Sequence, residues 1–350
     1  MSKILFVIQT LNKGGAERVV SNLSKEFVNL GHEVKIILFN NQISYDYGGA
    51  IISLQLPASK NYLIKFFRLF QRIARLKKIF NQENPDFIFS FMESCNFASI
   101  LTGKNVVISV RNNPNKFTLI QRFLIQILYK FKNVLAVVCV SKEIENILKN
   151  NYKIGNLVTI QNPIVFDNSY KIKEDLSNFK PFILAVGRLH TQKNFQMLIN
   201  AYAKTKAKNE TKLLILGDGN LKNELNLLIQ KLNLQQKVFL LGLKDNIKDY
   251  YLQCEIFILS SLYEGFPNAL IEALSNNSAC IVTDCPTGPS EIITNLQNGI
   301  LIENNNEKAM SEAIDKLYFD KEMLDKIRHN AKNSIQYLDV KNIAKKWLEL

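Results

Sequence analysis

The stretch "SSLYEGFPNALIEALSNN", residues 260–277, carries two acidic side chains, Glu264 and Glu272, on either side of a proline. Glu264 falls in a loop after an apolar run. Glu272 falls about one turn inside a helix that Pro267 or Asn268 begins, since both residue types favour helix starts. Carboxylates accept hydrogen bonds from paired hydroxyl groups, so the pair suits a sugar or a ribose. The alternative is that Glu264 only stabilises the positive helix end and that Glu272 is solvated.

A second polar loop, "GRLHTQKNF", carries Arg188 and Lys193 ahead of another predicted helix. Two cations beside a helix N-terminus suit a diphosphate, because arginine donates a planar fork and lysine a point charge. The alternative is a pair of solvated loop cations. Two further loops follow predicted strands, with Gly217 in "LGDG" and Leu243 and Lys244 after "FLLG". Exposed main-chain groups there can pair with the edge of a nucleobase.

The first glycine-rich loop lies near the N-terminus, where Gly14 and Gly15 precede a predicted helix in "TLNKGGAERVV". Adjacent glycines let the backbone approach a ligand, and the helix N-terminus offers N–H groups to an anion. The loop lacks the GxGxxG spacing of dinucleotide-binding proteins, so a simple tight turn is the alternative.

Short apolar runs that position these loops alternate with longer helical patterns. They are rich in Ile, Val, Leu and Phe, which is typical of strands buried on both faces of a parallel sheet. Such an order predicts two Rossmann-like, doubly wound α/β domains that face each other across a cleft, with ligands beside the carboxyl ends of the strands. The runs cover 4–9, 33–39, 86–91, 105–110 and 134–140, and then 182–187, 212–217, 237–242, 255–260 and 279–284.

The chain of 350 residues exceeds what a single core usually supports, which also favours two domains. We interpret the polar stretch 166–180 as a linker between an N-terminal domain, 1–165, and a C-terminal domain, 181–335. A last helical pattern, about 336–350, carries the sole tryptophan, Trp347. We expect this helix to pack back on the first domain.

Cysteine usage and the N-terminus indicate the compartment. The five cysteines are odd in number and include no CxxC pair, which favours reduced thiols. The apolar opening run is too short to span a bilayer and lacks the cleavage site of a signal peptide. We therefore expect a cytoplasmic protein. No cluster has metal-ligand spacing, so we expect no metal.

The net charge of +13 is concentrated in the first half of the chain, where residues 1–180 hold 24 Lys and Arg against 12 Asp and Glu. Residues 181–350 hold 20 against 19. Such a basic half suits nucleic acid, anionic lipid or a phosphorylated substrate. No nucleic-acid motif accompanies the charge, so nucleic acid is disfavoured.

Residues 60–80 contain seven Lys and Arg and no acid, interleaved with apolar side chains. A helix of this composition can lie in a membrane interface with its cations on anionic headgroups, and 116–132 is similar. The alternative is that the apolar residues face the core and the cations are solvated. The first interpretation predicts membrane-facing Arg68, Arg72, Arg75, Lys77 and Lys78 on an anionic inner-membrane surface.

Taken together, five motifs make the chain resemble the retaining glycosyltransferases of family 4, which have the GT-B fold of two Rossmann-like domains. The resemblance covers almost the whole chain. The motifs are "GGAER" at 14–18, "GRL" at 187–189 with Lys193, "LGDG" at 216–219, "EGFPNALIEA" at 264–273 and "GPSEIITNLQNGILI" at 288–302.

The resemblance implies a role for each matching residue. Arg188 and Lys193 bind the donor diphosphate, and Glu264 contacts the donor sugar; these three carry the catalysis. Glu272 binds the ribose, and Gly15 lies near the diphosphate. The remaining donor contacts implied are Leu243 and Lys244 for the base, and Gly265, Phe266 and Pro267 for sugar and phosphate. Gly217 is a further donor contact. No cofactor or metal is required, because a nucleotide sugar, preferably UDP-linked, is the co-substrate.

One feature departs from the family. Many relatives carry a histidine after the fourth or fifth strand of the first domain, whereas this chain has "SVRNNPNKF". Arg111, Asn112 and Asn113 occupy that region. We assign them, with Gly14, to the acceptor side.

The resemblance implies transfer of a hexose or N-acetylhexosamine, with retention, to a lipid-linked saccharide at the cytoplasmic face of the inner membrane. Such reactions build O-antigen, capsule or lipid-linked oligosaccharide, often on undecaprenyl diphosphate. One alternative, a Rossmann-type NAD(P)-dependent oxidoreductase, requires GxGxxG and an acidic end to the second strand, but the chain has "NKGGAE" and "LFNN". Another alternative is a non-catalytic basic membrane-surface adaptor. Such a protein does not need polar residues at successive strand ends, so their presence here argues against it.

Overall fold

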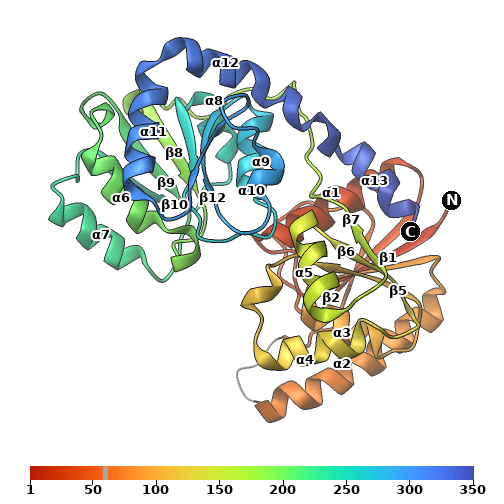
Figure 1. The fold of residues 1–350 in the computed structure, drawn as a ribbon. Coiled ribbons are helices and arrows are strands. Elements are labelled where there is room, and N and C mark those ends of the chain that lie inside the picture. Colours follow the sequence, from red (N-terminus) through yellow and green to blue (C-terminus); the bar gives the residue numbers. More distant parts are fainter. Residues whose placement is uncertain (58–61) are drawn as a thin grey trace. The chain divides into compact units, whose positions relative to one another are not determined.

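The computed structural model describes residues 1–57 and 62–350. The chain divides into two compact units, and each is described by itself. Unit 1 comprises Met1–Val165 and Leu338–Leu350, and unit 2 comprises Phe166–Tyr337. In Figure 1 each unit is a sheet flanked by helices. The stretch 166–180, interpreted above as a linker, lies within unit 2.

Unit 1 is built on a seven-stranded parallel sheet in the order β3-β2-β1-β4-β5-β6-β7. Its strands are β1 (Lys3–Ile8), β2 (Glu33–Leu38), β3 (Ala50–Ser53), β4 (Phe87–Phe91), β5 (Val106–Val110), β6 (Val134–Cys139) and β7 (Leu157–Thr159). Its helices are α1 (Gly15–Asn29), α2 (Tyr62–Glu83), α3 (Glu93–Ile100), α4 (Leu119–Leu128), α5 (Lys142–Tyr152) and α13 (Val340–Leu348), with a 3₁₀ turn η1 (Pro114–Lys116).

The core of unit 1 forms because strand and helix patterns meet face to face. Strand β1 is buried from Ile4 to Ile8, as its continuous apolar run requires. Helix α1 buries Val19, Val20, Leu23 and Phe27, which share one face at helical spacing. The ring of Phe27 stacks on Phe6 of β1 with the ring centroids 5.8 Å apart.

Helix α13 closes unit 1 through the sole tryptophan. Trp347 is fully buried, and its ring stacks on Phe91 of β4 at 5.3 Å and meets Phe89 edge-on at 5.1 Å. The N–H of Val340 donates to the carbonyl of Ile164 at 2.9 Å. Residues 338–350 therefore complete the first core, although they follow the whole of unit 2 in sequence.

Unit 2 is built on a six-stranded parallel sheet in the order β10-β9-β8-β11-β12-β13. Its strands are β8 (Phe182–Val186), β9 (Lys212–Leu216), β10 (Val238–Gly242), β11 (Ile256–Leu259), β12 (Ala279–Asp284) and β13 (Ile300–Glu303). Its helices are α6 (Phe195–Lys204), α7 (Lys222–Lys231), α8 (Ile247–Gln253), α9 (Asn268–Ser275), α10 (Pro289–Ile292), α11 (Glu307–Phe319) and α12 (Lys321–Ala331). Short 3₁₀ turns are η2 (Ser177–Phe179), η3 (Thr191–Lys193), η4 (Ala207–Asn209) and η5 (Asn333–Leu338), the last of which reaches the unit boundary.

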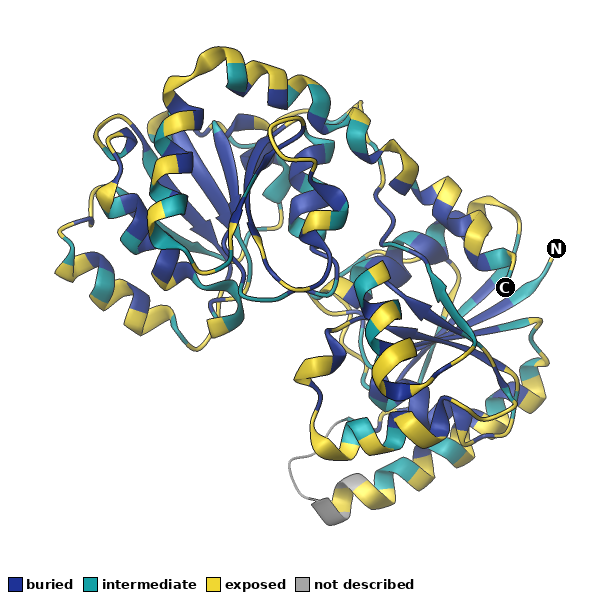
Figure 2. Cartoon of the chain, viewed as in Figure 1, coloured by how far each residue is buried: buried dark blue, intermediate teal, exposed yellow. Residues whose placement is uncertain are grey.

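The burial pattern confirms two parallel sheets covered by amphipathic helices. In Figure 2 the central strands of each unit are dark blue, and the flanking helices carry buried residues on one side and exposed residues on the other. The edge strands β3, β7 and β10 are only partly buried. The segment 166–180 is fixed to unit 2 by Asp249, whose fully buried carboxylate accepts hydrogen bonds from the N–H groups of Lys173 and Glu174 at 3.1 and 3.0 Å. Every strand thus presents its carboxyl end to the edge of its own sheet where ligands bind in such folds.

Candidate functional site

An ion pair joins two of the predicted catalytic residues at the carboxyl ends of the unit 2 strands. The Lys193 ammonium lies 2.5 Å from Oε1 of Glu264, and the same oxygen accepts a hydrogen bond from Ser261 at 2.6 Å. The two charged side chains are only 17% and 8% exposed. Because water screens such a pair weakly, each charge depends on the other for compensation.

Main-chain and side-chain hydrogen bonds hold the two loops of this ion pair together. The N–H of Leu262 donates to the carbonyl of Gln192 at 2.8 Å, and Nε2 of Gln192 donates to the carbonyl of Tyr263 at 2.9 Å. The Ser260 hydroxyl donates to the carbonyl of Lys193 at 2.7 Å. The loop after β8 and the loop after β11 therefore form one rigid surface within unit 2.

Two glycines allow the neighbouring loops to approach. A Cβ atom on Gly217, where φ is +137°, would lie 1.9 Å from the carbonyl oxygen of Gly187. On Gly288, where φ is +98°, it would lie 3.0 Å from Cδ of Pro267. Positive φ and close contact both require glycine at these positions. Gly217 thus has a packing role in the loop in which the sequence predicts donor contact.

The remaining predicted donor residues of this region have different environments. Arg188 is exposed, and its guanidinium forms no ion pair with the described residues, so it can bind an incoming anion. Glu272 is half-buried in the second turn of α9, and its Oε2 accepts a hydrogen bond from the Tyr251 hydroxyl at 3.3 Å. Glu264 is thus joined to the basic loop through Lys193, and Glu272 contacts Tyr251 of α8.

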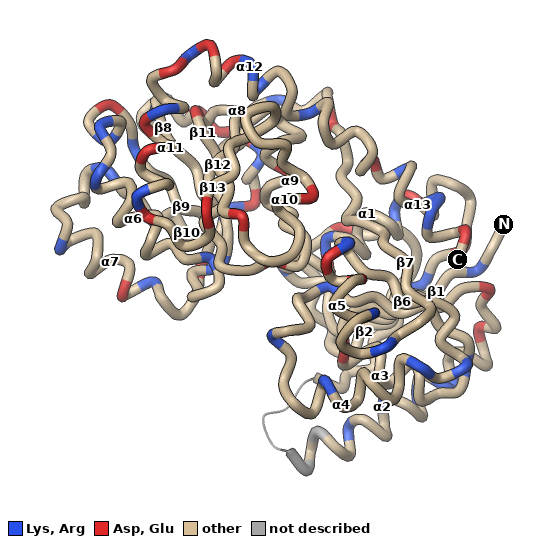
Figure 3. Tube along the Cα trace, viewed as in Figure 1, with Lys and Arg blue, Asp and Glu red and all other residues tan. Residues whose placement is uncertain are grey.

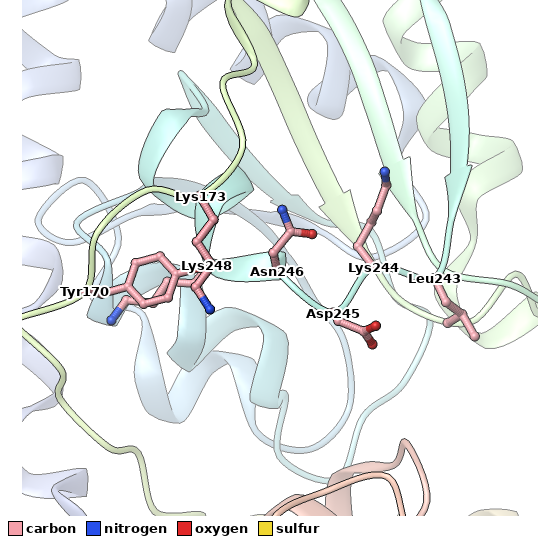
Figure 4. Close-up of a pocket in the computed structure, with 7 residues that line it drawn as sticks. All are labelled: Tyr170, Lys173, Leu243, Lys244, Asp245, Asn246 and Lys248. Atoms are coloured by element: carbon pink, nitrogen blue, oxygen red, sulfur yellow. The ribbon is translucent and has the colours of Figure 1, made fainter.

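An open pocket of about 520 Å³ lies after β10, beside the residues predicted to border a nucleobase. Figure 4 shows Leu243 on one side of it and Tyr170, Lys173 and Lys248 on the other. Lys244 hydrogen-bonds Tyr250, and this bond, with the charge of Glu174, raises the pKa of Lys244 above its ordinary value. The pocket is basic and partly aromatic, and both properties suit a nucleotide.

In unit 1 the structure places a buried cation at the carboxyl end of β5. The guanidinium of Arg111 donates to Ser109 Oγ at 3.2 Å and to Oδ1 of Asn162, and it lies 5.4 Å from the ring centre of Phe91. Burial lowers the pKa of Arg111 to about 9, while the nearby charge of Glu17 raises it. Arg111 therefore stays charged at neutral pH and is fixed in place.

The other residues assigned to the acceptor side differ in accessibility. Asn112 is exposed, and its amide contacts the sulfur of Met92 at 4.0 Å. Asn113 is buried, and its Oδ1 accepts from the N–H of Asn115 at 2.9 Å. This bond caps η1, so the Asn113 side chain shapes the loop. In the same unit, the half-buried Gly14 precedes α1 and the exposed Gly15 is its first residue.

Glu93 is a titratable residue at this sheet edge that the sequence analysis does not single out. It opens α3 directly after Met92, whose φ of +75° is strained for a residue with a side chain. Burial raises the pKa of Glu93 from 4.5 to about 7, and its Oε1 has no hydrogen-bond partner among the described residues. In the sequence, Glu93 could have been identified as a candidate because it closely follows an apolar run predicted to be a buried strand.

Not all of the cations predicted to face a membrane are exposed in the structure. Arg72 is buried: its guanidinium lies 4.5 Å from the ring centre of Phe39, and it donates to the carbonyl of Leu56 at 2.6 Å. The prediction for Arg72 is therefore wrong, because three arginines of α2 bind main-chain carbonyls of the segment before it. The others are Arg68 with the carbonyl of Pro57 and Arg75 with that of Leu54.

Lys77 and Lys78 remain exposed, as do large apolar side chains of α2 and α4. Figure 3 shows Lys and Arg positions along α2 and around α4. Residues 60 and 61, at the start of the predicted basic stretch, lie outside the described residues. Within the described ranges, no helix is both long and apolar enough to cross a bilayer, and no three His, Cys, Asp or Glu side chains gather as a metal site.

Comparisons with known proteins identify the family. Residues 13–167 match the family model for Glycosyltransferase Family 4, and residues 167–334 match that for Glycosyl transferases group 1. A Campylobacter jejuni protein, N-acetylgalactosamine-N,N'-diacetylbacillosaminyl-diphospho-undecaprenol 4-alpha-N-acetylgalactosaminyltransferase, is 34% identical over 99% of this chain and 98% of its own. An amylovoran biosynthesis glycosyltransferase of Erwinia amylovora is 29% identical over 100% and 99%.

Solved structures share the fold. An Anabaena protein in complex with UDP and glucose superposes with a TM-score of 0.82 at 18% identity, covering 100% of this chain and 99% of its own. A sucrose-phosphate synthase from Thermosynechococcus elongatus gives 0.87 at 17% identity, over 100% and 98%. The chain therefore belongs to the family 4 glycosyltransferases and has their GT-B fold of two Rossmann-like units, which excludes a nicotinamide-dependent oxidoreductase.

Proposed function

We propose that the protein is a retaining glycosyltransferase that moves a hexose or N-acetylhexosamine from a nucleotide sugar, preferably UDP-linked, to a lipid-linked saccharide. The main support for binding of a nucleotide-sugar donor is the Lys193–Glu264 ion pair, together with the exposed Arg188 in the same loop as Lys193. The three side chains combine cations for a diphosphate with a carboxylate for sugar hydroxyls at one sheet edge. The Anabaena structures that contain UDP, UDP-glucose, or UDP and glucose support a UDP-sugar.

In the proposed reaction, the acceptor hydroxyl attacks the anomeric carbon on the face from which the diphosphate leaves. The bond from the anomeric carbon to the phosphate oxygen breaks, a new bond to the acceptor oxygen forms, and the hydroxyl proton passes to the departing phosphate. Lys193 and Arg188 stabilise the charge that develops on the diphosphate, which is the main catalytic contribution of the site. Lys193 has three N–H donors, so it can bind the diphosphate while still bound to Glu264.

The acceptor and the pathway follow from the relatives. Two Campylobacter jejuni proteins of 34% and 29% identity are named for undecaprenol-diphosphate-linked acceptors and alpha-linked products. An alpha product made from an alpha-linked nucleotide sugar corresponds to retention. We therefore place the reaction in the assembly of O-antigen, capsule or a lipid-linked oligosaccharide.

A donor screen tests this proposal. The protein is incubated separately with UDP-glucose, UDP-galactose, their N-acetylhexosamine counterparts and GDP-mannose, and release of free nucleotide is followed without acceptor and then with an acceptor. The acceptor is the diphospho-undecaprenol disaccharide named for the first Campylobacter relative. We expect one donor to be consumed faster with acceptor, and an alpha linkage in the product by NMR.

Matched variants locate the chemistry. Arg188→Ala and Lys193→Ala should lose most activity, while Lys204→Ala, which removes another unit 2 lysine paired to Glu307 at 2.6 Å, should not. Absence of binding and turnover with every nucleotide sugar would overturn the proposed function and leave a non-catalytic adaptor as the remaining interpretation. A beta product would overturn retention alone.

We further propose that unit 1 docks on the anionic cytoplasmic face of the inner membrane. The support is a set of exposed apolar side chains on two helices that both pack against α3, together with the exposed Lys77 and Lys78. Such side chains on a basic surface suit a bilayer interface. The apolar residues are Ile64, Phe66, Phe67 and Phe70 of α2 and Leu119, Ile120, Phe123 and Ile127 of α4.

A further inference from the structure

Polar side chains from three loops of unit 1 meet at the carboxyl edge of its sheet. The loops follow β1, β4 and β5, which are neighbours in the strand order. Glu17 comes from the first of them, Met92 and Glu93 from the second, and Arg111 and Asn112 from the third. The proposed reaction has so far assigned no role to either carboxylate, and of the two Glu17 is the more accessible.

Glu17 lies in the first turn of α1 and is half-buried. Its Oε1 accepts a hydrogen bond from the Thr10 hydroxyl at 3.4 Å. The other oxygen occupies the space that a side chain at position 14 would fill, since a Cβ on Gly14 would lie 2.2 Å from Oε2 of Glu17. Gly14 has φ −155°, which any residue can adopt, so a side chain at this position would act by displacing the Glu17 carboxylate and not by straining the backbone.

A fixed positive charge lies at the same edge of the sheet, at the end of β5. Arg111 is buried, bound by Ser109 and Asn162, and placed over Phe91, so its guanidinium cannot follow a moving ligand. The negative charge of Glu17 opposes the lowering of the Arg111 pKa by burial.

This arrangement leaves an ionised carboxylate beside an exposed backbone. Gly15, next to it, is exposed, so a ligand can approach Glu17 without passing a side chain at that position. An ionised carboxylate only accepts hydrogen bonds, and saccharides offer several hydroxyl donors. Asn112, exposed at the neighbouring strand end, adds an amide with donor and acceptor atoms.

We propose that Glu17 binds a hydroxyl group of the acceptor saccharide. This inference rests on the proposed function, because it names the acceptor-binding carboxylate of the same reaction. It separates two acidic roles: Glu264 in unit 2 acts on the donor sugar, and Glu17 in unit 1 acts on the acceptor.

The test compares transfer with donor hydrolysis in the same variants. Glu17→Gln keeps the shape of the side chain and removes its charge, and Gly14→Ala displaces the carboxylate while leaving Glu17 in the chain. Both should reduce transfer kcat/KM by about 10- to 100-fold, the usual effect of losing a charged hydrogen bond, mainly through the acceptor KM. UDP binding by calorimetry and the slow release of UDP without acceptor should match the wild type. Glu322→Gln, a first-turn glutamate of α12, is the matched control.

Two probes serve as acceptors: the diphospho-undecaprenol disaccharide of the Campylobacter relative and phenyl N-acetyl-α-galactosaminide. Thermal melts verify that each variant is folded, and Glu17→Asp should recover part of the transfer rate if the carboxylate itself is needed. Unchanged transfer by Glu17→Gln would overturn the inference. A parallel fall in donor hydrolysis would do so as well, because it would assign Glu17 to the donor. If the wild type releases UDP but glycosylates neither probe, the acceptor class and this inference both fail. If it releases no nucleotide at all, the proposed function fails.

Discussion

At the scale of single residues, the decisive contact is the 2.5 Å ion pair between Lys193 and Glu264. It joins side chains 71 residues apart that come from two different loops, and Ser261 supports it from the second loop. Removing either partner leaves the other charge in a weakly solvated site. Donor binding and local stability should therefore depend on both residues together.

The first prediction concerns this pair. Lys193→Met and Glu264→Gln should each lower donor turnover by about 10²- to 10³-fold, because each removes charge from the site of the diphosphate or the sugar. The double variant should have nearly the same kcat/KM as the less active of the two single variants. Residues that act as a unit give non-additive losses. The measurement is kcat/KM for nucleotide release, with melting curves to verify folding. Fully multiplicative losses would show that the two residues act independently.

Glu93 gives a prediction about pH. Its pKa is raised from 4.5 to about 7 in the folded protein, so the folded state binds more protons than the unfolded state between these values. Stability should therefore decrease as pH rises through this window, by up to about 3 kcal/mol for this one group. Glu93→Gln, which stays neutral, should remove the decrease and gain stability over the wild type at pH 8 more than at pH 5.

The sole tryptophan, Trp347, lies in the core of unit 1, so its fluorescence reports the unfolding of the unit that contains Glu93. Urea unfolding of wild type and variant at both pH values measures the difference. Glu322→Gln on the exposed side of α12 controls for the loss of one carboxylate. An equal difference at both pH values would mean that Glu93 is ionised in the folded protein.

At the scale of elements, α2 and α4 depart from the usual helix pattern. Both pack against α3, yet large apolar side chains remain outside: Phe67 is 66% exposed and Leu119 is 82% exposed. The arginines of α2 donate to main-chain carbonyls of residues 54–57. Arg72 is buried, whereas Arg75, Lys77 and Lys78 are exposed. Apolar side chains should then supply most of the membrane affinity.

The third prediction follows from that division. Replacing Phe66, Phe67 and Phe70 by Ser should lower binding to anionic vesicles at least about tenfold, because each buried aromatic side chain contributes roughly 1.5–3 kcal/mol. The double variant Lys77→Gln and Lys78→Gln should mainly make vesicle binding less sensitive to salt concentration. Vesicle flotation measures both. Leu227→Ser, an exposed leucine of α7, is the control. Equal flotation of the triple variant and the wild type would contradict membrane docking through α2.

At the scale of the whole molecule, the C-terminal helix belongs to the first core. Trp347 stacks on Phe91, and the guanidinium of Arg111 lies near the same ring, so the chain terminus and the acceptor-side loop share one packing partner. Folding of unit 1 is therefore incomplete until the last residues of the chain are present.

The fourth prediction concerns this helix. Trp347→Ala should destabilise unit 1 by about 3–5 kcal/mol, the usual cost of deleting a buried aromatic side chain. Trp347→Phe should cost clearly less, because the indole Nε1 has no hydrogen-bond partner in the described part of the chain and none is lost. Circular dichroism during urea unfolding measures both variants. Equal losses for Ala and Phe would imply a specific role for the indole nitrogen.

The sequence determined the features that local pattern encodes. Apolar runs of strand length, alternating with helices, predicted two parallel sheets, and the structure has them. The order of polar loops after these runs placed Arg188, Lys193 and Glu264 at strand ends, and the match to known motifs identified the family. These features could be predicted because periodicity and turn chemistry are properties of short segments.

Tertiary structure alone decided which of these side chains meet. It paired Lys193 with Glu264, buried Arg72 against Phe39 although its segment appears exposed and basic, and brought Glu17 toward Arg111 across two strand ends. The physical reason is that burial and pairing depend on long-range packing. A charged side chain in sequence looks the same whether water or a buried carbonyl will satisfy it.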